Sequence, residues 1–564
     1  MFSVAILIGI YSYLIFAIGL LGLLYRQVIL LLTFVFFIFC IVLFKKQIKY
    51  FTTGFITRSI LAKAVQGYSF NNLSFLLLSL LIIQSLINLI GTLGPELGFD
   101  ALWYHLTLPK LYIQNHSVLH IPGSLLYYSN MPKLTEMLYT ASLFFGNEIL
   151  AKLVHFSFGL LSSIALYFLS KKFLDRNLSL IVVLIFYSNL VVGWQSITAY
   201  VDLSRTFFEL MALWGFINFV DKDTPSMKLT RSILAKRVWL VESAVMLGLA
   251  VSIKLLALGS IGIFSYLIIY FGLSNHKKIT KVLIDVLTFI LFSLAVPLPW
   301  FIFSFVHTGN PIYPIFSSFF QDINHQVFNA ALLNPINFIK TSWKVLTQAS
   351  DPISPVYIIF LPVIILTFKK LNFHSKIISL YCLLGFIYWY FTSRVEGARL
   401  LVPYLPAVSL VSIISFNNLK RNNINVPVLR KIGLTVVLLI VFISIAYRSI
   451  ANYKYLPVIL GVESKGQFLT DHLNFSFGDF YDTDNYFKKN ITSKDTVLLY
   501  GFHNLYYVNF PFIDSSWAKK GDRFNYIATQ NSDLPKRFSN WNLIYYNPKT
   551  HVNLYSLGGI RWVY

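Results

Sequence analysis

Residues 73–93, LSFLLLSLLIIQSLINLIGTL, form an uncharged apolar run, and the polar stretch 94–110, GPELGFDALWYHLTLPK, follows it at once. A bilayer core takes about 20 apolar residues of helix, so the first stretch is long enough to be a membrane span. The second stretch brings Glu96, Asp100 and His105 together with aromatic residues directly after that span. The sequence therefore predicts an α-helical polytopic membrane protein whose polar chemistry lies at a membrane surface.

The composition of the whole chain supports this class. Of the 564 residues, 56% are hydrophobic and 12% are charged, whereas an ordinary soluble protein carries about 25% charged residues. The net charge of +23 lies in short clusters between apolar runs, as in the cytoplasmic loops of membrane proteins, so we expect no nucleic-acid partner. Cys40 and Cys382 both lie in apolar runs and indicate neither a disulfide framework nor a metal site.

Hydropathy predicts about 13 transmembrane helices. No basic segment precedes the first apolar run, so we expect a span there and not a removed signal peptide. The expected spans cover residues 4–24, 27–44, 73–93, 149–169, 178–193, 200–220, 239–253, 255–272, 282–303, 355–368, 377–392, 399–416 and 432–449.

The basic residues predict the orientation of these spans. Clusters of Lys and Arg follow the second, fourth, sixth, eighth, tenth and twelfth spans. Cytoplasmic loops carry an excess of Lys and Arg, so we expect a cytoplasmic N-terminus and an extracytoplasmic segment after the last span. The expected location is a plasma membrane of bacterial type, with membrane lipids as neighbours.

The outer side of the membrane is predicted to carry two structured regions. The first outer loop, 94–148, contains the amphipathic pieces 101–114 and 133–146, which we expect to form helices lying in the membrane interface. After residue 450 the composition changes and short strand-like segments appear, which predicts a small extracytoplasmic α/β domain over residues 450–564. Residues 1–449 then form the transmembrane domain.

Asp100 and His105 are candidate functional residues of the first outer loop. A carboxylate beside a membrane-surface cavity can act as a general base, although loop acids are also often solvated or cap the next helix. His105 can either contact a substrate or be only a polar tip at headgroup level. Lys133 and Glu136 are weaker candidates, since their i, i+3 spacing suits a surface helix pair.

Further ionisable residues lie at the outer ends of later spans. Asp202 and Arg205 begin the sixth span, where such residues usually face a cavity or a partner. Their i, i+3 spacing also suits a local ion pair. Lys254 interrupts an apolar run and can either snorkel to the surface or bind an anionic headgroup.

The stretch SRVEGAR, residues 393–399, adds two arginines around one glutamate. Arg394, Glu396 and Arg399 can form a salt-bridged turn, and the arginines can also hold a phosphate, since a guanidinium matches phosphate bidentately. The sequence has no Gly-rich P-loop, GxSxG or HExxH motif. A nucleotide-dependent reaction on the cytoplasmic side therefore has no support.

Taken in order, six stretches resemble the membrane glycosyltransferases of the GT-C superfamily, in particular bacterial family-39-like enzymes that use a polyprenyl-phosphate-linked sugar. In this family's pattern Asp100 is the first acid, but Ala101 follows it where many relatives have a second acid. The stretches are GFDALWYHLTLPKLY (98–112), MPKLTEMLYTASLFFG (131–146), AYVDLSRTFFELMAL (199–213), GLAVSIKLLALGSI (248–261), LPWFIFSFVHTGNPIYP (298–314) and ARLLVPYLPAVSLV (398–411).

The resemblance implies inverting transfer of the sugar to an acceptor hydroxyl of a lipid, glycan or protein, with polyprenyl phosphate as the leaving group. It implies that Asp100 is the base, that Asp202 shapes the site, and that Lys254, Arg394 and Arg399 stabilise the phosphate. No cofactor is required, although Asp100 and Asp202 can also hold a divalent metal. The other expected substrate contacts are Tyr104, His105, Lys110, Glu136, Arg205, Asn310, Tyr313 and Glu396.

Three alternatives remain at this stage. A transporter or flippase for a lipid-linked sugar would also span the membrane and bind the same ligand. A non-catalytic assembly subunit would keep the fold and tolerate Asp100→Asn. A ligase that takes whole glycans from a lipid diphosphate is the third, because the second acid after Asp100 is missing.

Overall fold

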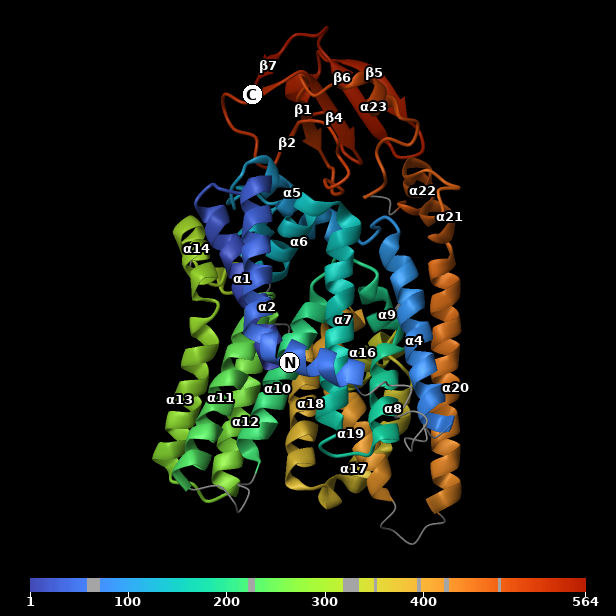
Figure 1. Cartoon of the computed structure of the whole chain (residues 1–564). Coiled ribbons are helices and arrows are strands. Elements are labelled where there is room, and N and C mark those ends of the chain that lie inside the picture. Colours follow the sequence, from blue (N-terminus) through green and yellow to red (C-terminus); the bar gives the residue numbers. More distant parts are fainter. Residues whose placement is uncertain are drawn as a thin grey trace.

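The computed structural model describes residues 1–57, 72–221, 229–317, 334–348, 352–392, 397–419, 426–474 and 478–564. It has two parts, a bundle of long helices and a small sheet domain at one end of that bundle (Figure 1). The first helices are α1 (Phe2–Leu20), α2 (Arg26–Thr57), α4 (Asn72–Leu93), α5 (Thr107–Gln114), α6 (Leu134–Phe145), α7 (Glu148–Ser170), α8 (Arg176–Tyr187), α9 (Leu190–Ser196) and α10 (Asp202–Val220).

The later helices complete the bundle and lead into the sheet domain. Helix α20 is the last long one, and short helices α21 to α23 follow it (Figure 1). These helices are α11 (Leu229–Val251), α12 (Leu258–Ser274), α13 (Ile279–Ala295), α14 (Leu298–Thr308), α16 (Pro335–Gln348), α17 (Val356–Thr367), α18 (Phe373–Phe391), α19 (Leu405–Asn418), α20 (Val426–Tyr453), α21 (Leu456–Ile459), α22 (Lys465–His472) and α23 (Tyr486–Asn490).

The expected spans all coincide with helices, but the count of thirteen is not confirmed. Within the described residues, 7 helices are long and apolar enough to cross a membrane, and the number rises to 9 if each of two bent helix pairs is one span. The remaining expected spans fall on α10, α11, α17 and α18, which do not meet that criterion. Helix α17 has only 12 residues, and α10 carries Asp202, Arg205 and Glu209.

Residues 94–148, for which the name first outer loop is kept from the expected topology, are helical where amphipathic pieces were expected. Residues 101–114 form a short π-helical segment, η1 (Ala101–His105), followed by α5, and residues 133–146 contain α6. Helix α6 packs against α1, α5 and α7, so this loop lies on the bundle and is not detached from it. Helix α7 begins where the Asn147 side chain accepts a hydrogen bond from the backbone N–H of Ile149 at 3.0 Å, which satisfies one of the free amides of its first turn.

The C-terminal part is a small mixed domain, as expected. Its 5-stranded sheet has the order β2-β1-β4-β6-β5, in which β1 is parallel to both neighbours and β6 is antiparallel to β4 and β5. A separate pair joins β3 to β7. The strands are β1 (Val497–Tyr500), β2 (Phe512–Asp514), β3 (Arg523–Phe524), β4 (Tyr526–Gln530), β5 (Asn542–Asn547), β6 (Val552–Ser556) and β7 (Trp562–Val563).

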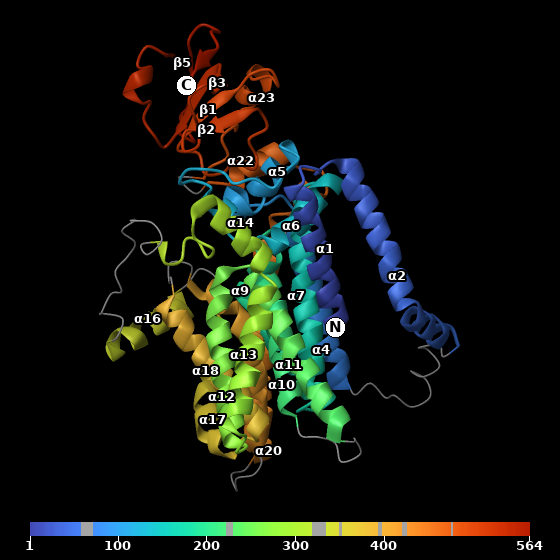
Figure 2. The same ribbon diagram turned by 90° about the vertical axis from the view of Figure 1, so that its left-hand side faces the viewer.

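The sheet domain is attached to the first outer loop by specific contacts. The Lys110 ammonium donates hydrogen bonds to the carbonyls of Leu505, Tyr506 and Val508. The Tyr507 hydroxyl donates to the Glu96 carbonyl at 2.9 Å. The loop after β1 therefore rests on the same segment that carries Asp100, and Figure 2 shows the domain above α5 and α6.

Candidate active site

A cavity of about 950 Å³ lies where the first outer loop, α9, the segment between α11 and α12, and the 3-10 segment η6 (Gly397–Tyr404) meet. This volume is in the upper part of the usual range for small-molecule sites. Among the residues expected from the sequence, Asp100, Tyr104, His105, Glu136, Lys254 and Arg399 line it. The other lining residues include Phe99, Trp103, Tyr127, Tyr128, Lys133, Trp194 and Tyr200.

Asp100 lies at the cavity wall, with 17% of its side chain exposed. Its Oδ2 accepts a hydrogen bond from Arg399 Nη1 at 2.6 Å and a longer one from the Tyr104 hydroxyl at 3.3 Å. Its backbone N–H donates to the Tyr200 hydroxyl at 3.2 Å. The carboxylate is thus held by a cation but still borders the cavity, which a base that meets a substrate hydroxyl must do.

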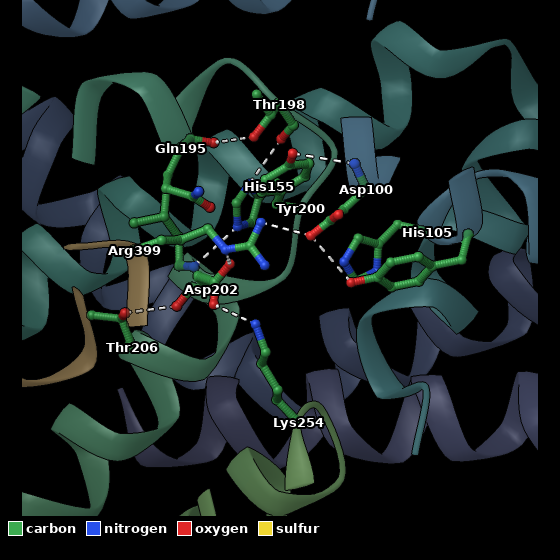
Figure 3. Close-up of polar contacts among 12 residues, drawn as sticks. Asp100, His105, His155, Gln195, Thr198, Tyr200, Asp202, Thr206, Lys254 and Arg399 are labelled. Atoms are coloured by element: carbon green, nitrogen blue, oxygen red, sulfur yellow. Dashed lines mark hydrogen bonds and ion pairs between the residues drawn. The ribbon is translucent and has the colours of Figure 1, made fainter. Parts of the chain in front are cut away.

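Asp202, the first residue of α10, lies behind Asp100 and is 1% exposed. Its Oδ1 accepts from Lys254 Nζ at 3.1 Å, and its Oδ2 is 3.4 Å from Arg399 Nε. Arg399 therefore pairs with both carboxylates. The two carboxylates, the guanidinium and the Lys254 ammonium form one connected array of charges (Figure 3). Such an array keeps two cations beside the cavity without a large excess of charge.

Tyr200 and His155 support this array from behind. The Arg399 guanidinium lies over the Tyr200 ring, 4.7 Å from its centroid. His155 Nδ1 is 2.8 Å from the Thr198 carbonyl, and His155 Nε2 accepts from the backbone N–H of Leu203 at 3.0 Å. These two partners assign the proton to Nδ1 and the neutral tautomer to the ring. His155 thus fixes the backbone on both sides of Asp202.

A second buried cluster forms another part of the cavity wall. His105 Nδ1 is 2.8 Å from Glu136 Oε1, and Lys133 Nζ is 3.6 Å from the same oxygen. Burial lowers the pKa values of His105 and Lys133. Burial would raise the pKa of Glu136, but the nearby Lys133 and His105 outweigh it and lower that pKa. The Glu136 carboxylate thus contacts both His105 and Lys133 in one buried cluster.

The other residues expected to contact substrate lie elsewhere. Arg205 forms a buried pair with Glu209 at 2.6 Å, one turn along α10. Lys110 holds the sheet domain, as described above. The Asn310 side chain bonds within its own turn, to Ile312 N and the Ile315 carbonyl. Tyr313 packs edge-on against Tyr127, and its neighbours Pro314 and Ile315, not Tyr313, line the cavity. Arg394 and Glu396 lie outside the described residues.

Sequence reasoning did not identify Tyr200, His155 or Glu96 as parts of the site. Each contacts a part of the chain that lies far away in the sequence, and no short motif marks such a contact. One signal was available for Tyr200, because it stands two positions before Asp202 in the second acidic stretch. Lys133 was named only as half of a surface helix pair, yet it is 3% exposed and lines the cavity.

The two aspartates do not form a ready cation site. Within the described part of the chain, no group of three or more His, Cys, Asp or Glu side chains is arranged to hold a metal ion. The carboxylates of Asp100 and Asp202 point to Arg399, which occupies the position that a bridging cation would need. A divalent ion would have to displace this guanidinium.

Comparison with known proteins gives information on the fold. No family model matches the chain, and no curated protein matches it. ArnT from Cupriavidus metallidurans bound to undecaprenyl phosphate matches with a TM-score of 0.54 and 11% identity, covering 85% of this chain and 97% of ArnT. The apo state of ArnT matches with a TM-score of 0.53 and 11% identity, over 86% and 97% of the two chains.

A weaker match is the oligosaccharyltransferase from Archaeoglobus fulgidus, with a TM-score of 0.44 and 14% identity over 80% of this chain and 69% of that one. The match to ArnT covers most of this chain and nearly all of ArnT, and at this level of identity it shows a shared fold. The chain therefore has the fold of the GT-C membrane glycosyltransferases, as the resemblance in its sequence predicted.

Proposed function

We propose that this protein is an inverting glycosyltransferase that moves a sugar from a polyprenyl-phosphate donor to an acceptor hydroxyl at the extracytoplasmic face. The observation that carries the proposal is the array of Asp100, Arg399, Asp202 and Lys254 at a cavity of about 950 Å³. The array supplies a carboxylate for the acceptor proton and cations for a phosphate. The GT-C fold, shared with a protein solved with undecaprenyl phosphate, supports this class of donor.

In the proposed reaction the acceptor oxygen attacks the anomeric carbon of the donor sugar. The bond between that carbon and the phosphate oxygen breaks, and polyprenyl phosphate leaves with the electron pair. The acceptor proton passes to Asp100. Arg399 and Lys254 stabilise the charge that develops on the departing phosphate. A single displacement of this kind needs one base and forms no covalent sugar–enzyme intermediate.

The Asp100–Arg399 ion pair indicates that the donor binds before Asp100 accepts the proton of the acceptor. In the free protein Arg399 holds Asp100 at 2.6 Å. A donor phosphate competes for the same guanidinium, since Arg binds phosphate and carboxylate with the same geometry. Donor binding thus weakens the hold on Asp100 and makes its carboxylate available to the acceptor hydroxyl. Asp202, deeper and paired with Lys254, keeps both cations in place.

The proposal includes the orientation of the protein in the membrane. Thirteen spans, a cytoplasmic N-terminus and an extracytoplasmic domain over residues 450–564 put the cavity on the outer side, where a flipped donor is available. The lysine and arginine clusters after alternate spans support this orientation. The acceptor hydroxyl belongs to a lipid, a glycan or a protein. The scheme uses the cations of the protein itself and requires no metal ion.

The test uses purified protein in lipid with a panel of polyprenyl-phosphate sugars and native membrane extract as the acceptor source. Wild type is expected to transfer sugar, and Asp100→Asn to lose about 10²- to 10⁴-fold, the usual contribution of a general base. Asp533→Asn, an exposed acid of the sheet domain, is the matched control and should keep full activity. Equal transfer by wild type and Asp100→Asn would remove Asp100 from the mechanism.

A transporter or flippase for a lipid-linked sugar is the second candidate. Two helix pairs are sharply bent, α8 with α9 by 69° and α13 with α14 by 61°, and interrupted helices near a binding site are common in transporters. Release of polyprenyl phosphate that depends on an acceptor separates the two, since a transporter leaves the lipid-linked sugar intact. A non-catalytic subunit would show no release with any donor.

A further inference from the structure

Glu96 lies at the point where the two acidic stretches meet, yet it is not among the residues that line the candidate active-site cavity. It is 0% exposed. We call residues 94–100 the first acidic loop, which ends at Asp100, and residues 197–202 the second acidic loop, which ends at Asp202. A buried carboxylate without partners is very costly, so the contacts of Glu96 indicate what it is for.

The Glu96 carboxylate joins these two loops. Its Oε1 accepts from the backbone N–H groups of Leu97 at 2.9 Å and Gly98 at 2.6 Å, both in its own loop. Its Oε2 accepts from the backbone N–H of Ala199 at 2.5 Å, in the other loop. Hydrogen bonds to a charged acceptor are the strong ones among protein hydrogen bonds. One side chain thus fixes the separation of two segments that lie about a hundred residues apart in the chain.

The surroundings allow little movement of this link. Lys152 Nζ donates to the carbonyls of Gly91, Gly94 and Pro95 at 3.0, 2.7 and 3.2 Å, directly before Glu96. A Cβ atom added at Gly98 would lie 2.9 Å from Glu96 Oε1 and 2.9 Å from the Tyr200 ring, so only glycine permits this close approach. Both ends of the first acidic loop are therefore held, and the loop transmits the position of Glu96 to Asp100.

We propose that Glu96 is a positioning residue that sets the placement of Asp100 relative to Asp202 and Arg399. This inference rests on the proposed function, because the distance it controls matters only if both aspartates serve one reaction. Glu96 does not touch the reacting atoms. Its effect on rate comes from geometry, and a misplacement of about 1 Å can cost about 100-fold in an oriented site.

Glu96→Gln tests the link with almost no change of shape. The amide keeps one acceptor oxygen but presents an NH2 group that cannot accept from a backbone N–H. Either the bonds to Leu97 and Gly98 or the bond to Ala199 must be lost. We expect kcat to fall 10- to 100-fold, KM for the donor to change less than threefold, and hydrogen exchange to increase in residues 97–99 or 199–201.

Glu148→Gln is the matched control. Glu148 is also a buried glutamate, but it accepts from Lys465 at 2.5 Å and from the Tyr506 and Tyr507 hydroxyls at 3.3 and 3.5 Å. These partners all lie after the last long helix, so Glu148 holds the sheet domain and not the second acidic loop. We expect this variant to lower Tm and to leave kcat unchanged. Equal losses of kcat in both variants would mean that Glu96 affects activity only through the stability of the fold, and this result would overturn the inference.

A double-mutant cycle completes the test, because residues that act through one another are not additive. In the Asp100→Asn background, Glu96→Gln is expected to lower the residual rate less than twofold. Additive losses, or full activity of Glu96→Gln, would overturn the role of Glu96 while leaving the proposed function intact. Unchanged exchange in both acidic loops would overturn it whatever the rate. If wild type transfers no sugar, the proposed function fails and this inference fails with it.

Discussion

Arg399 is the residue on which the charge balance of the site depends. It is 6% exposed, reaches both aspartates and lies over the Tyr200 ring. A lysine has the same charge but a single ammonium, which cannot reproduce a planar fork that faces two carboxylates and a ring at once. The site therefore depends on arginine geometry and not only on positive charge.

Arg399→Lys is accordingly expected to lower kcat/KM for the donor about 10- to 100-fold, since one hydrogen bond to a charged group contributes about 1.5–3 kcal/mol. Steady-state kinetics with varied donor measures this loss. Arg523→Lys, on an exposed position of β3, serves as the control and should match wild type. Wild-type kinetics for Arg399→Lys would contradict a role for this guanidinium in phosphate binding.

At the residue scale, the sequence analysis named ionisable residues that lie within or beside apolar runs. Asp100, Asp202 and Lys254 stand out in this way, and with Arg399 they lie together in the structure. The sequence analysis considered a pair of Arg205 with Asp202 at i, i+3, whereas the structure pairs Arg205 with Glu209 at i, i+4. Both spacings place the side chains on one helix face, so spacing alone does not decide between the two partners. The roles of all these residues in catalysis remain predictions.

At the scale of elements, hydropathy located the helices but not their breaks. The sequence analysis predicted one span over residues 178–193 and another over 282–303, yet the structure divides each into two helices, α8 with α9 and α13 with α14. Asn189 is extended between α8 and α9, and Pro297 and Pro299 stand where α13 gives way to α14. A proline removes a backbone donor and clashes with the preceding turn, while a hydropathy average records only the apolar side chains.

The burial of Lys110 between α5 and the sheet domain predicts the sign of a pH dependence. Burial lowers the pKa of Lys110 to about 7, whereas an unfolded lysine titrates near about 10.4. Between these values the unfolded chain binds more protons than the folded one, so the Lys110 contribution to stability rises with pH. Below pH 7 the cost of burying the ammonium is fully present.

Lys110→Met should therefore flatten the increase of stability with pH between about 7 and 10. Thermal unfolding of the purified protein in detergent, repeated across this range, measures the slope. Lys520→Met changes an exposed lysine of the sheet domain and should leave the slope of wild type unchanged. Parallel slopes for wild type and Lys110→Met would show that this ammonium is not buried at the junction.

For the whole molecule, the orientation in the membrane decides whether the cavity meets a flipped donor. The sheet domain and the first outer loop are at one end of the bundle, and the connection between α12 and α13 is at the other (Figure 1). This connection carries Lys277 and Lys278. Basic clusters favour the cytoplasmic side, so the sheet domain is expected outside. The sequence predicted a helical bundle and a small C-terminal domain. It could not predict how the two are joined, because the junction depends on tertiary contacts of single residues such as Lys110.

Single cysteines at exposed positions test this orientation in whole cells, with Cys40 and Cys382 replaced by serine. A membrane-impermeant maleimide should label Ser539→Cys in the sheet domain of intact cells. It should label Asn275→Cys, beside the cluster at Lys277, only after permeabilisation. The reverse pattern would put the cavity on the cytoplasmic side and would contradict the proposed topology.

The most direct test of the central proposal is the stoichiometry of product formation by wild-type protein in lipid. With a polyprenyl-phosphate sugar and an acceptor extract, one polyprenyl phosphate is expected to be released for each sugar transferred. Both products should fall together in Asp100→Asn. Movement of the intact lipid-linked sugar across the bilayer without release of polyprenyl phosphate would contradict the transferase account and establish a transporter in its place.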